Sequence, residues 1–524
     1  MSWIRKLFRT RLHTTTFVTF TILVGALITP LSSNLTSSWT LTKFQSQTLD
    51  WKSCLDNTVQ CASFKVPVDY NTIANKKSTK DVFTLQVLRH KASEQKNRIG
   101  SLIVNPGGPG ASAMEYAFNY DSIVSEAINK RYDIVGFDPR GVNKSEPIRC
   151  LSNKDEDRLL ASDGRVTNAK EESQYIANAK YFADKCAQAA GNRLGHYSTL
   201  ETAKDMEILR ILLGDTKLHY LGKSYGTYLG TLYAALYPTH IGHMVLDGAM
   251  DPNQSVRDQN LSQAIGFDNA LKDFLKSKVN ALENVSTNDP SSTTSSSISS
   301  SSTKKLTLAR IKEFVTRSHT KPLISKKGRT LTDELLITAI ATALYDNETG
   351  WPQLNSALRQ AIDQKNPNEL LSLADDYNQR DLNGNYITNM NDISAMTTCL
   401  DGRDSRTLAQ VRADQSTFET QAPIFGPFLN YAGANCNVWK VAPQNPPAIT
   451  SLKTSPIIII GVTNDPATPY SGALALHKIM TSSTLLTFQG DGHTGHGRGN
   501  SCIDSIVDGY LTGKNESKIF FICD

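Results

Sequence analysis

Short apolar runs alternate with amphipathic stretches over the first half of the chain. The alternating segment 82–89 and the apolar segments 99–105 and 131–137 predict strands. The stretches 168–190 and 201–213 have the spacing of helices that pack one face against a core. Strands that alternate with helices are typical of a largely parallel sheet with helices on both faces. The first half of the chain therefore predicts an α/β domain.

The pattern changes in the second half. Residues 253–446 have mainly helical periodicity and contain a serine and threonine run at 286–303, which predicts a disordered loop. Four consecutive isoleucines then indicate a fully buried strand, and a last strand is expected at 483–489. We therefore expect a core built from 51–252 and 447–524, with an inserted helical cap, or lid, between these two parts.

The N-terminus carries the pattern of an export signal. Basic residues precede an apolar run from 17 to 31, which is short for a membrane span of about 20 residues. We expect residues 1–33 to be a signal peptide, with an uncleaved signal anchor as the alternative, and 34–50 to be a flexible lead. The expected location is extracellular, either secreted or anchored at the cell surface by that N-terminal segment.

Composition excludes one class of partner. The 524 residues are 39% hydrophobic and 20% charged, which is ordinary for a globular protein. The net charge of +5 is small, and four of the positive residues lie within the first eleven. No basic face with interleaved aromatic residues is recognisable, so nucleic-acid binding is not expected.

The eight cysteines suggest disulfides, because an even number in an exported chain is typical of disulfide-bonded proteins. Proximity in the sequence favours Cys54–Cys61, Cys150–Cys186, Cys399–Cys436 and Cys502–Cys523, although sequence alone does not fix the connectivity. None of the eight has a spacing typical of metal ligands. We expect neither a metal nor another cofactor.

The segment 217–227 predicts a strand, a very tight turn and a helix. Its centre is Gly222-Lys-Ser224-Tyr-Gly226, the Gly-x-Ser-x-Gly pattern of a nucleophile elbow. Glycine is required beside such a turn because a Cβ would clash. Ser224 should then lie at the carboxyl edge of the sheet, at a helix N-terminus that favours negative charge. A purely structural serine is the alternative.

A serine nucleophile needs a histidine base, and the base needs an acid to orient it. Asp465 follows the isoleucine strand and His493 follows the last strand, so the chain order is Ser, Asp, His, as expected for this elbow. His496 competes as the base, but His493 is nearer the strand end. Asp465 taken alone would fit a turn residue, and we interpret Asp491 as a turn former.

A glycine-rich loop, 106–112, follows the strand 99–105. Such a loop lets a backbone N–H approach a substrate oxygen, so it predicts part of an oxyanion hole. We expect the donors to be the N–H groups of Gly108, with Gly107 as second choice, and Tyr225. A simple tight loop is the alternative.

Taken together, several motifs resemble one known family, the secreted tripeptidyl aminopeptidases, α/β-hydrolases related to prolyl iminopeptidases. The matching stretches are Val66-Pro-Val-Asp-Tyr70, Asn105-Pro-Gly-Gly-Pro-Gly110, Asp133-Ile-Val-Gly-Phe-Asp-Pro-Arg-Gly141, Gly222-Lys-Ser-Tyr-Gly-Thr-Tyr-Leu-Gly230, Val245-Leu-Asp-Gly248 with Asp251-Pro252, and a C-terminal Gly-His-Thr with Cys502 and Tyr510-Leu511. The resemblance implies an α/β-hydrolase fold with a helical cap and a serine exopeptidase that releases short peptides, often tripeptides, from a free N-terminus. We expect the protein to be a monomer. It implies the nucleophile, acid and base roles for Ser224, Asp465 and His493.

Two features depart from that family pattern. Lys223 occupies a position that is more often small or apolar, and the segment 286–303 has the character of an insertion. Both bear on substrate preference. An aminopeptidase must also bind the protonated N-terminus of its peptide, which calls for a carboxylate. Asp401 is our candidate, with Asp333 and Glu334 as others, and a solvated acidic residue is the alternative for each.

Two other functions remain open at this point. A carboxylesterase or lipase would use the same three residues on an ester substrate. A non-catalytic surface binding protein on a hydrolase scaffold is the alternative outside enzymes, although all three residue types of a triad are present.

Overall fold

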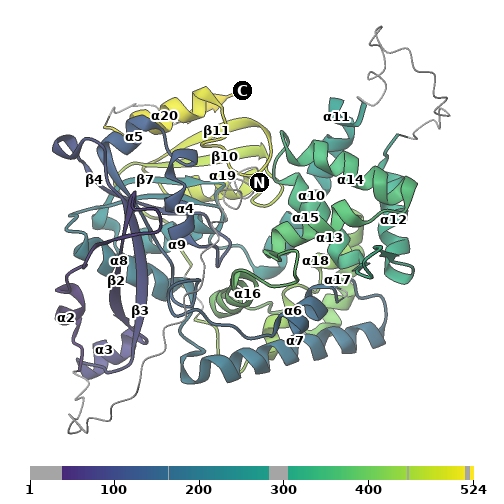
Figure 1. The fold of residues 1–524 in the computed structure, drawn as a ribbon, viewed down its shortest axis with the longest axis horizontal. Helices are drawn as coiled ribbons and strands as arrows, with labels where there is room; N and C mark the ends of the chain where they lie inside the picture. The colour runs from purple at the N-terminus through teal and green to yellow at the C-terminus, as the bar shows by residue number, and fades with distance from the viewer. Residues whose placement is uncertain (1–37, 163, 282–304, 445, 447, 514–519) are drawn as a thin grey trace, which may run out of the picture.

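A computed structural model describes residues 38–162, 164–281, 305–444, 446, 448–513 and 520–524. The expected signal at 1–33 and the serine and threonine run at 286–303 lie outside these residues. A central sheet with its flanking helices forms one side of the molecule, and α10 to α15 gather on the other side (Figure 1). Among the described residues, no helix has the length and apolar character that crossing a membrane would require.

One ten-stranded sheet forms the core. In spatial order its strands are β1 (Lys52–Cys54), β2 (Val59–Pro67), β3 (Val82–His90), β5 (Tyr132–Phe137), β4 (Gly100–Asn105), β6 (Leu218–Lys223), β7 (Ile241–Asp247), β10 (Ile457–Asn464), β11 (Ser483–Asp491) and β12 (Phe520–Cys523). Pairing is antiparallel from β1 to β5 and parallel from β5 to β12. The predicted α/β fold with a mostly parallel sheet is confirmed.

Helices cover both faces of this sheet. Side chains from α8 (Thr199–Leu212), α9 (Tyr225–Leu236) and α19 (Tyr470–Ile479) share one buried cluster with Ile103 and Val135. The adjacent Leu102 and Ile134 point to the other face and pack with α4 (Ala113–Phe118), α5 (Glu126–Arg131) and α20 (Ser501–Leu511). Successive strand residues alternate between faces, so a run of apolar residues is buried throughout.

The inserted region contains its own apolar core, with Phe274, Leu336 and Leu358 among its fully buried side chains. Its elements are α10 (Val256–Lys276), α11 (Lys278–Ala281), α12 (Leu308–Thr320), the hairpin of β8 (Leu323–Ile324) and β9 (Thr330–Leu331), α13 (Asp333–Leu344), α14 (Gly350–Gln364), α15 (Asn368–Asn378), α16 (Met390–Asp401), α17 (Leu408–Gln421) and α18 (Gly426–Leu429). The limits 253–446 stay a prediction for the cap as a unit.

The structure also bears on the predicted disulfides and on the N-terminal lead. The four predicted disulfides form, between Cys54 and Cys61, Cys150 and Cys186, Cys399 and Cys436, and Cys502 and Cys523. The lead 34–50 differs from the expectation of flexibility over its described part. There α2 (Leu41–Gln45) buries Phe44 completely, because this aromatic side chain packs into the core of the sheet domain.

Candidate active site

Ser224 lies between β6 and α9 in a strained backbone conformation, with φ 55° and ψ −124°. Its N–H donates to the carbonyl of Asp247 over 2.9 Å. The two motif glycines have no room for a side chain. A Cβ on Gly222 would lie 2.5 Å from the carbonyl oxygen of Gly226, and a Cβ on Gly226 would lie 2.9 Å from Asn105 Oδ1. The turn therefore has the sharpness that the motif predicts.

His493 and Asp465 are held together at the ends of adjacent strands, β11 and β10. His493 Nδ1 lies 2.9 Å from both carboxylate oxygens of Asp465. The carboxylate is fully buried and also accepts hydrogen bonds from the N–H groups of Ala467, Thr468 and Thr494 and from the Thr468 hydroxyl. So many donors fix the orientation of the Asp465 carboxyl group, which in turn fixes the orientation of the imidazole.

Ser224 and His493 line the same cavity, of about 230 Å³, together with Gly108. Because Nδ1 of His493 is held by Asp465, Nε2 is the nitrogen left to exchange a proton with the serine. The ring of Tyr345 packs edge-on against His493 at 5.0 Å, and the His493 N–H donates to the Tyr345 carbonyl over 2.9 Å. Residues from the inserted helices thus complete the cavity wall.

The glycine loop packs directly on the elbow. A Cβ on Gly107 would lie 2.6 Å from the carbonyl oxygen of Lys223 and 3.1 Å from the Tyr225 nitrogen. The Gly107 N–H already donates to Asn105 Oδ1 over 2.9 Å, which leaves Gly108 as the better donor to a substrate. Tyr225 is the first residue of α9, so its N–H has no partner within the helix.

Asp138 anchors the far end of this loop. Its carboxylate accepts hydrogen bonds from the Ser112 hydroxyl and from the N–H groups of Met114 and Lys144, and burial raises its pKa to about 6. Arg140 is bound elsewhere: its buried guanidinium pairs with Asp205 and Glu201. Asp138 and Arg140 therefore do not pair with each other, since Arg140 binds two carboxylates on α8.

Comparison with known proteins agrees with this geometry. The sequence model of the alpha/beta hydrolase fold matches residues 100–497. The chain belongs to this family. It is 34% identical to the "Serine protease Hip1" of Mycobacterium tuberculosis over 89% of both chains. It is 28% identical to the "Tripeptidyl aminopeptidase" of Streptomyces lividans, over 90% of this chain and 86% of that one.

Further relatives of this hydrolase carry another activity in their names. The chain is 32% identical to a "Carboxylesterase B" of Mycobacterium tuberculosis, over 88% of this chain and 87% of that one. Among solved structures, esterase E22 aligns with 86% of this chain and 100% of its own length, at 12% identity and a TM-score of 0.38. The predicted resemblance to tripeptidyl aminopeptidases is confirmed, and so is the assignment as a hydrolase.

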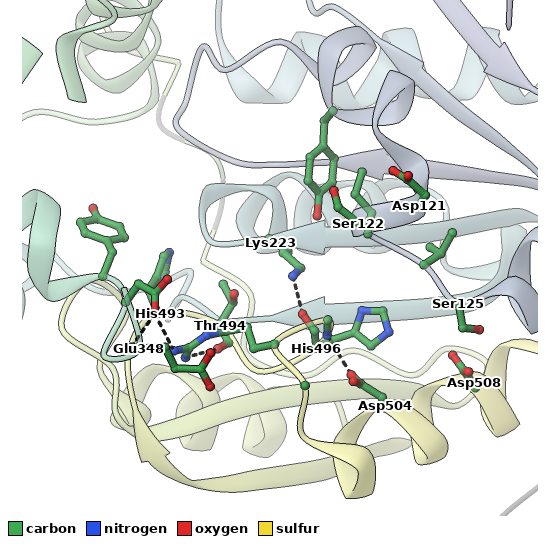
Figure 2. Close-up of a pocket in the computed structure, with 18 residues that line it drawn as sticks. Asp121, Ser122, Ser125, Lys223, Glu348, His493, Thr494, His496, Asp504 and Asp508 are labelled. Atoms are coloured by element: carbon green, nitrogen blue, oxygen red, sulfur yellow. Dashed lines mark hydrogen bonds and ion pairs between the residues drawn. The ribbon is translucent and has the colours of Figure 1, made fainter. Parts of the chain in front are cut away.

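Lys223, the lysine inside the Gly-x-Ser-x-Gly motif, has hydrogen-bonding and ionic partners. Lys223 Nζ donates to the carbonyl of His496 over 2.6 Å (Figure 2). It also lies 3.7 Å from Asp247 Oδ2. Burial lowers the pKa of Lys223. Asp247 also accepts hydrogen bonds from the N–H groups of Gly495 and His496. Lys223 and Asp247 therefore fasten the loop that carries His493 to the strands beside the nucleophile.

The competing histidine does not contact the acid. His496 is buried, and burial together with the charge of Lys223 lowers its pKa to about 3. His493 alone of the two is hydrogen-bonded to Asp465 within the part of the chain that the structure describes. Sequence reasoning singled out neither Asp247 nor the contact of Lys223. The only signal was the position of Asp247 at the end of a strand next to the elbow.

Asp401 lies at the C-terminal end of α16 and contacts α8. Its carboxylate accepts hydrogen bonds from the Thr199 N–H over 2.8 Å and the Thr199 hydroxyl over 2.5 Å, and that hydroxyl lies 2.5 Å from the Tyr225 hydroxyl. Asp401 is not among the residues that line the cavity of Ser224. Its role in binding a substrate amine stays a prediction. The other two candidates, Asp333 and Glu334, are bonded to His319 and to Gly164.

Two groups of potential metal ligands come close together among the described residues. One is Cys150, Cys186 and Asp392, where both cysteines form a disulfide. The other is Asp69, His196 and Glu201, where Glu201 is paired with Arg140. Neither group lines the cavity of Ser224.

Proposed function

We propose that this hydrolase is a serine peptidase that releases short peptides, in the first place tripeptides, from a free N-terminus. The observation that carries this proposal is that His493, which lines the cavity of Ser224, is hydrogen-bonded to the buried Asp465. The relation to a serine protease and to a tripeptidyl aminopeptidase supports peptide bonds as its target.

The proposed reaction begins with Ser224 Oγ attacking the scissile carbonyl carbon while its proton moves to His493 Nε2. The N–H groups of Gly108 and Tyr225 stabilise the resulting oxyanion. His493 then protonates the leaving nitrogen, the C–N bond breaks, and an acyl-enzyme remains on Ser224. Water, deprotonated by His493, attacks the ester carbonyl. The bond to Ser224 Oγ breaks as His493 returns the proton to Oγ, and the N-terminal peptide leaves. Asp465 orients the imidazole and stabilises its charged form throughout.

Export is part of the proposal. The four disulfides are typical of proteins from oxidising compartments, and the N-terminal apolar run supports a signal peptide or anchor. We propose that the enzyme acts outside the cell as a monomer.

Mass spectrometry of the products of a defined nine-residue peptide tests the exopeptidase activity. We expect the N-terminal tripeptide to appear first and the next tripeptide to follow, with none formed by Ser224→Ala. The same peptide with an acetylated N-terminus should be cleaved slowly. Cleavage at internal bonds irrespective of the free N-terminus would contradict the proposal.

A carboxylesterase is the second candidate, favoured by the relative named for that activity. The two functions differ in whether the leaving group is an amine or an alcohol. Tripeptide anilides and short acyl esters should therefore be assayed side by side. Turnover of the ester without turnover of the anilide would favour the esterase.

A further inference from the structure

The cavity that contains Ser224 has one carboxylate in its lining, among the residues that the structure describes. This carboxylate belongs to Glu115, which lies on α4 directly after the glycine loop. The other charged side chains of the lining are Lys223 and His493. Lys223 is bound to the His496 carbonyl and lies near Asp247, and His493 is bound to Asp465. Glu115 is thus the acid that a ligand in this cavity would meet.

Glu115 is positioned firmly but keeps bonding capacity. Its N–H donates a hydrogen bond over 3.1 Å to the hydroxyl of Ser112, which is the N-cap residue of α4. Oε1 accepts a hydrogen bond from Asn143 Nδ2 over 3.0 Å. Oε2 has no hydrogen-bond partner within the described part of the chain. A half-buried carboxylate with one fixed and one open oxygen suits a ligand that supplies both positive charge and N–H donors.

We infer that Glu115 binds the protonated amino group of the peptide substrate and so restricts cleavage to free N-termini. This inference rests on the proposed function, whose substrate carries such a group. The remaining walls fit a peptide, because Tyr345, Tyr377 and Met390 supply apolar surface from the inserted helices. The amine would be held on the acyl side of the scissile bond, where its distance from Ser224 limits the length of the released peptide.

Asp401, the acid that sequence reasoning favoured, is less suited to this role. Both of its oxygens already accept hydrogen bonds from Thr199, and it lies outside the lining of the cavity. The two acids can therefore be tested against each other in one experiment.

The test compares a tripeptide anilide with a free N-terminus and its N-acetylated form, on the purified full chain. We expect the wild type to prefer the free form. Glu115→Gln should lower kcat/KM for the free form by about 10- to 100-fold, mainly through KM, since it removes one charge-assisted hydrogen bond. It should leave the acetylated form unaffected.

Two further variants complete the comparison. Glu126→Gln, at an exposed position on α5, is the matched control and should behave as the wild type. Asp401→Asn should keep the preference for the free form. If Glu115→Gln keeps the wild-type preference for the free N-terminus, the inference is overturned, but the exopeptidase function still stands. If Asp401→Asn loses that preference instead, the binding of the amino group is assigned to Asp401. A wild type without any preference would remove both the exopeptidase function and the inference.

The pH dependence of the wild type gives a second test that needs no variant. Burial raises the pKa of Glu115, against the opposing effects of Asn143 and Lys144. Other titratable groups beside Glu115 or in the same cavity are Asp138, Lys223 and His493. Taking the ratio of the two substrates cancels any effect that these groups have on both. The ratio of KM values, acetylated over free, should fall as acidification protonates Glu115, starting at a higher pH than for an ordinary glutamate of pKa about 4.3. A ratio independent of pH in this range would overturn the inference.

Discussion

Ser224 occupies a backbone conformation that costs free energy, and its neighbours have to compensate for that cost. A positive φ is unfavourable for a residue with a side chain. The hydrogen bond from the Ser224 N–H to the Asp247 carbonyl and the close packing of Gly222, Gly226 and Gly107 hold the turn in place. The Ser224 hydroxyl is therefore held on a tightly packed turn that has no space to relax.

Replacing a motif glycine should test this rigidity. A Cβ on Gly222 would lie 2.5 Å from a backbone oxygen, so Gly222→Ala must displace the main chain. We expect a loss of about 1–3 kcal/mol in the free energy of unfolding, together with a large loss of activity. Denaturant unfolding measures the first effect. Gly195→Ala is the control, because no atom lies within 4 Å of its added Cβ; equal losses in both variants would contradict the packing argument.

The residues of the site differ in how far sequence could identify them. Ser224 carries a motif, and Asp465 and His493 follow strands in a known order, so local pattern and chain order predicted that these three residues lie close together. The contact of Lys223 with the His493 loop, and the place of Glu115 in the cavity wall, depend on loops from distant parts of the sequence. No periodicity or spacing encodes such contacts, and they could not be predicted.

Two inserted elements bear directly on the catalytic region. The residue after α13, Tyr345, binds the His493 main chain and packs on its ring. The last residue of α16, Asp401, caps the N-terminal Thr199 of α8 and reaches Tyr225 through the Thr199 hydroxyl. Displacement of either element would therefore shift His493 or Tyr225.

The junction of α16 and α8 should respond to pH. Burial raises the pKa of Asp401 to about 7, although the hydrogen bonds from Thr199 oppose the shift. A raised pKa in the folded state favours the protonated acid. The contribution of Asp401 to the free energy of unfolding is therefore fully present below its pKa in the unfolded chain, about 3.9. This contribution is lost as the pH rises to 7. Relative to wild type, Asp401→Asn should gain stability across this range.

Unfolding free energies at several pH values measure that difference. We expect the gap between Asp401→Asn and wild type to widen from pH 4 to pH 7 and then to level off. Glu126→Gln, whose carboxylate is exposed, should show no such widening. A gap of constant size would mean that Asp401 does not titrate in this range.

Helices and strands with a strong hydrophobic pattern were predicted closely, whereas elements with a weak hydrophobic pattern were not. The strand predicted at 99–105 is β4, and the helix predicted at 168–190 is α7 (Ala169–Ala190). Helices were expected within 253–446, but the sequence pattern did not single out α16 and α17. Apolar residues of α16, such as Ile393 and Met396, pack with the sheet domain, while α17 buries only Val411 and Phe418. A helix with so little buried surface leaves a weak pattern in the sequence.

At the scale of the whole molecule, the fold brings together segments that are far apart in the sequence. The elbow, the glycine loop and the ends of β10 and β11 meet at the carboxyl edge of the parallel strands, which is where ligands bind in open α/β sheets. The inserted helices cover this edge and contribute Tyr345, Tyr377 and Met390 to the cavity. Alternating strands and helices predicted this edge, but the packing of the inserted residues over it depends on side chains that carry no shared motif.

The central claim is that this convergence makes one serine reactive in a chain that is rich in serine. The most direct measurement is peptide mapping by mass spectrometry after reaction of the folded enzyme with a fluorophosphonate probe. The account predicts a single modification, on Ser224, which disappears in Ser224→Ala and is strongly slowed in His493→Ala. A probe adduct on another serine, or undiminished labelling of Ser224→Ala, would contradict it.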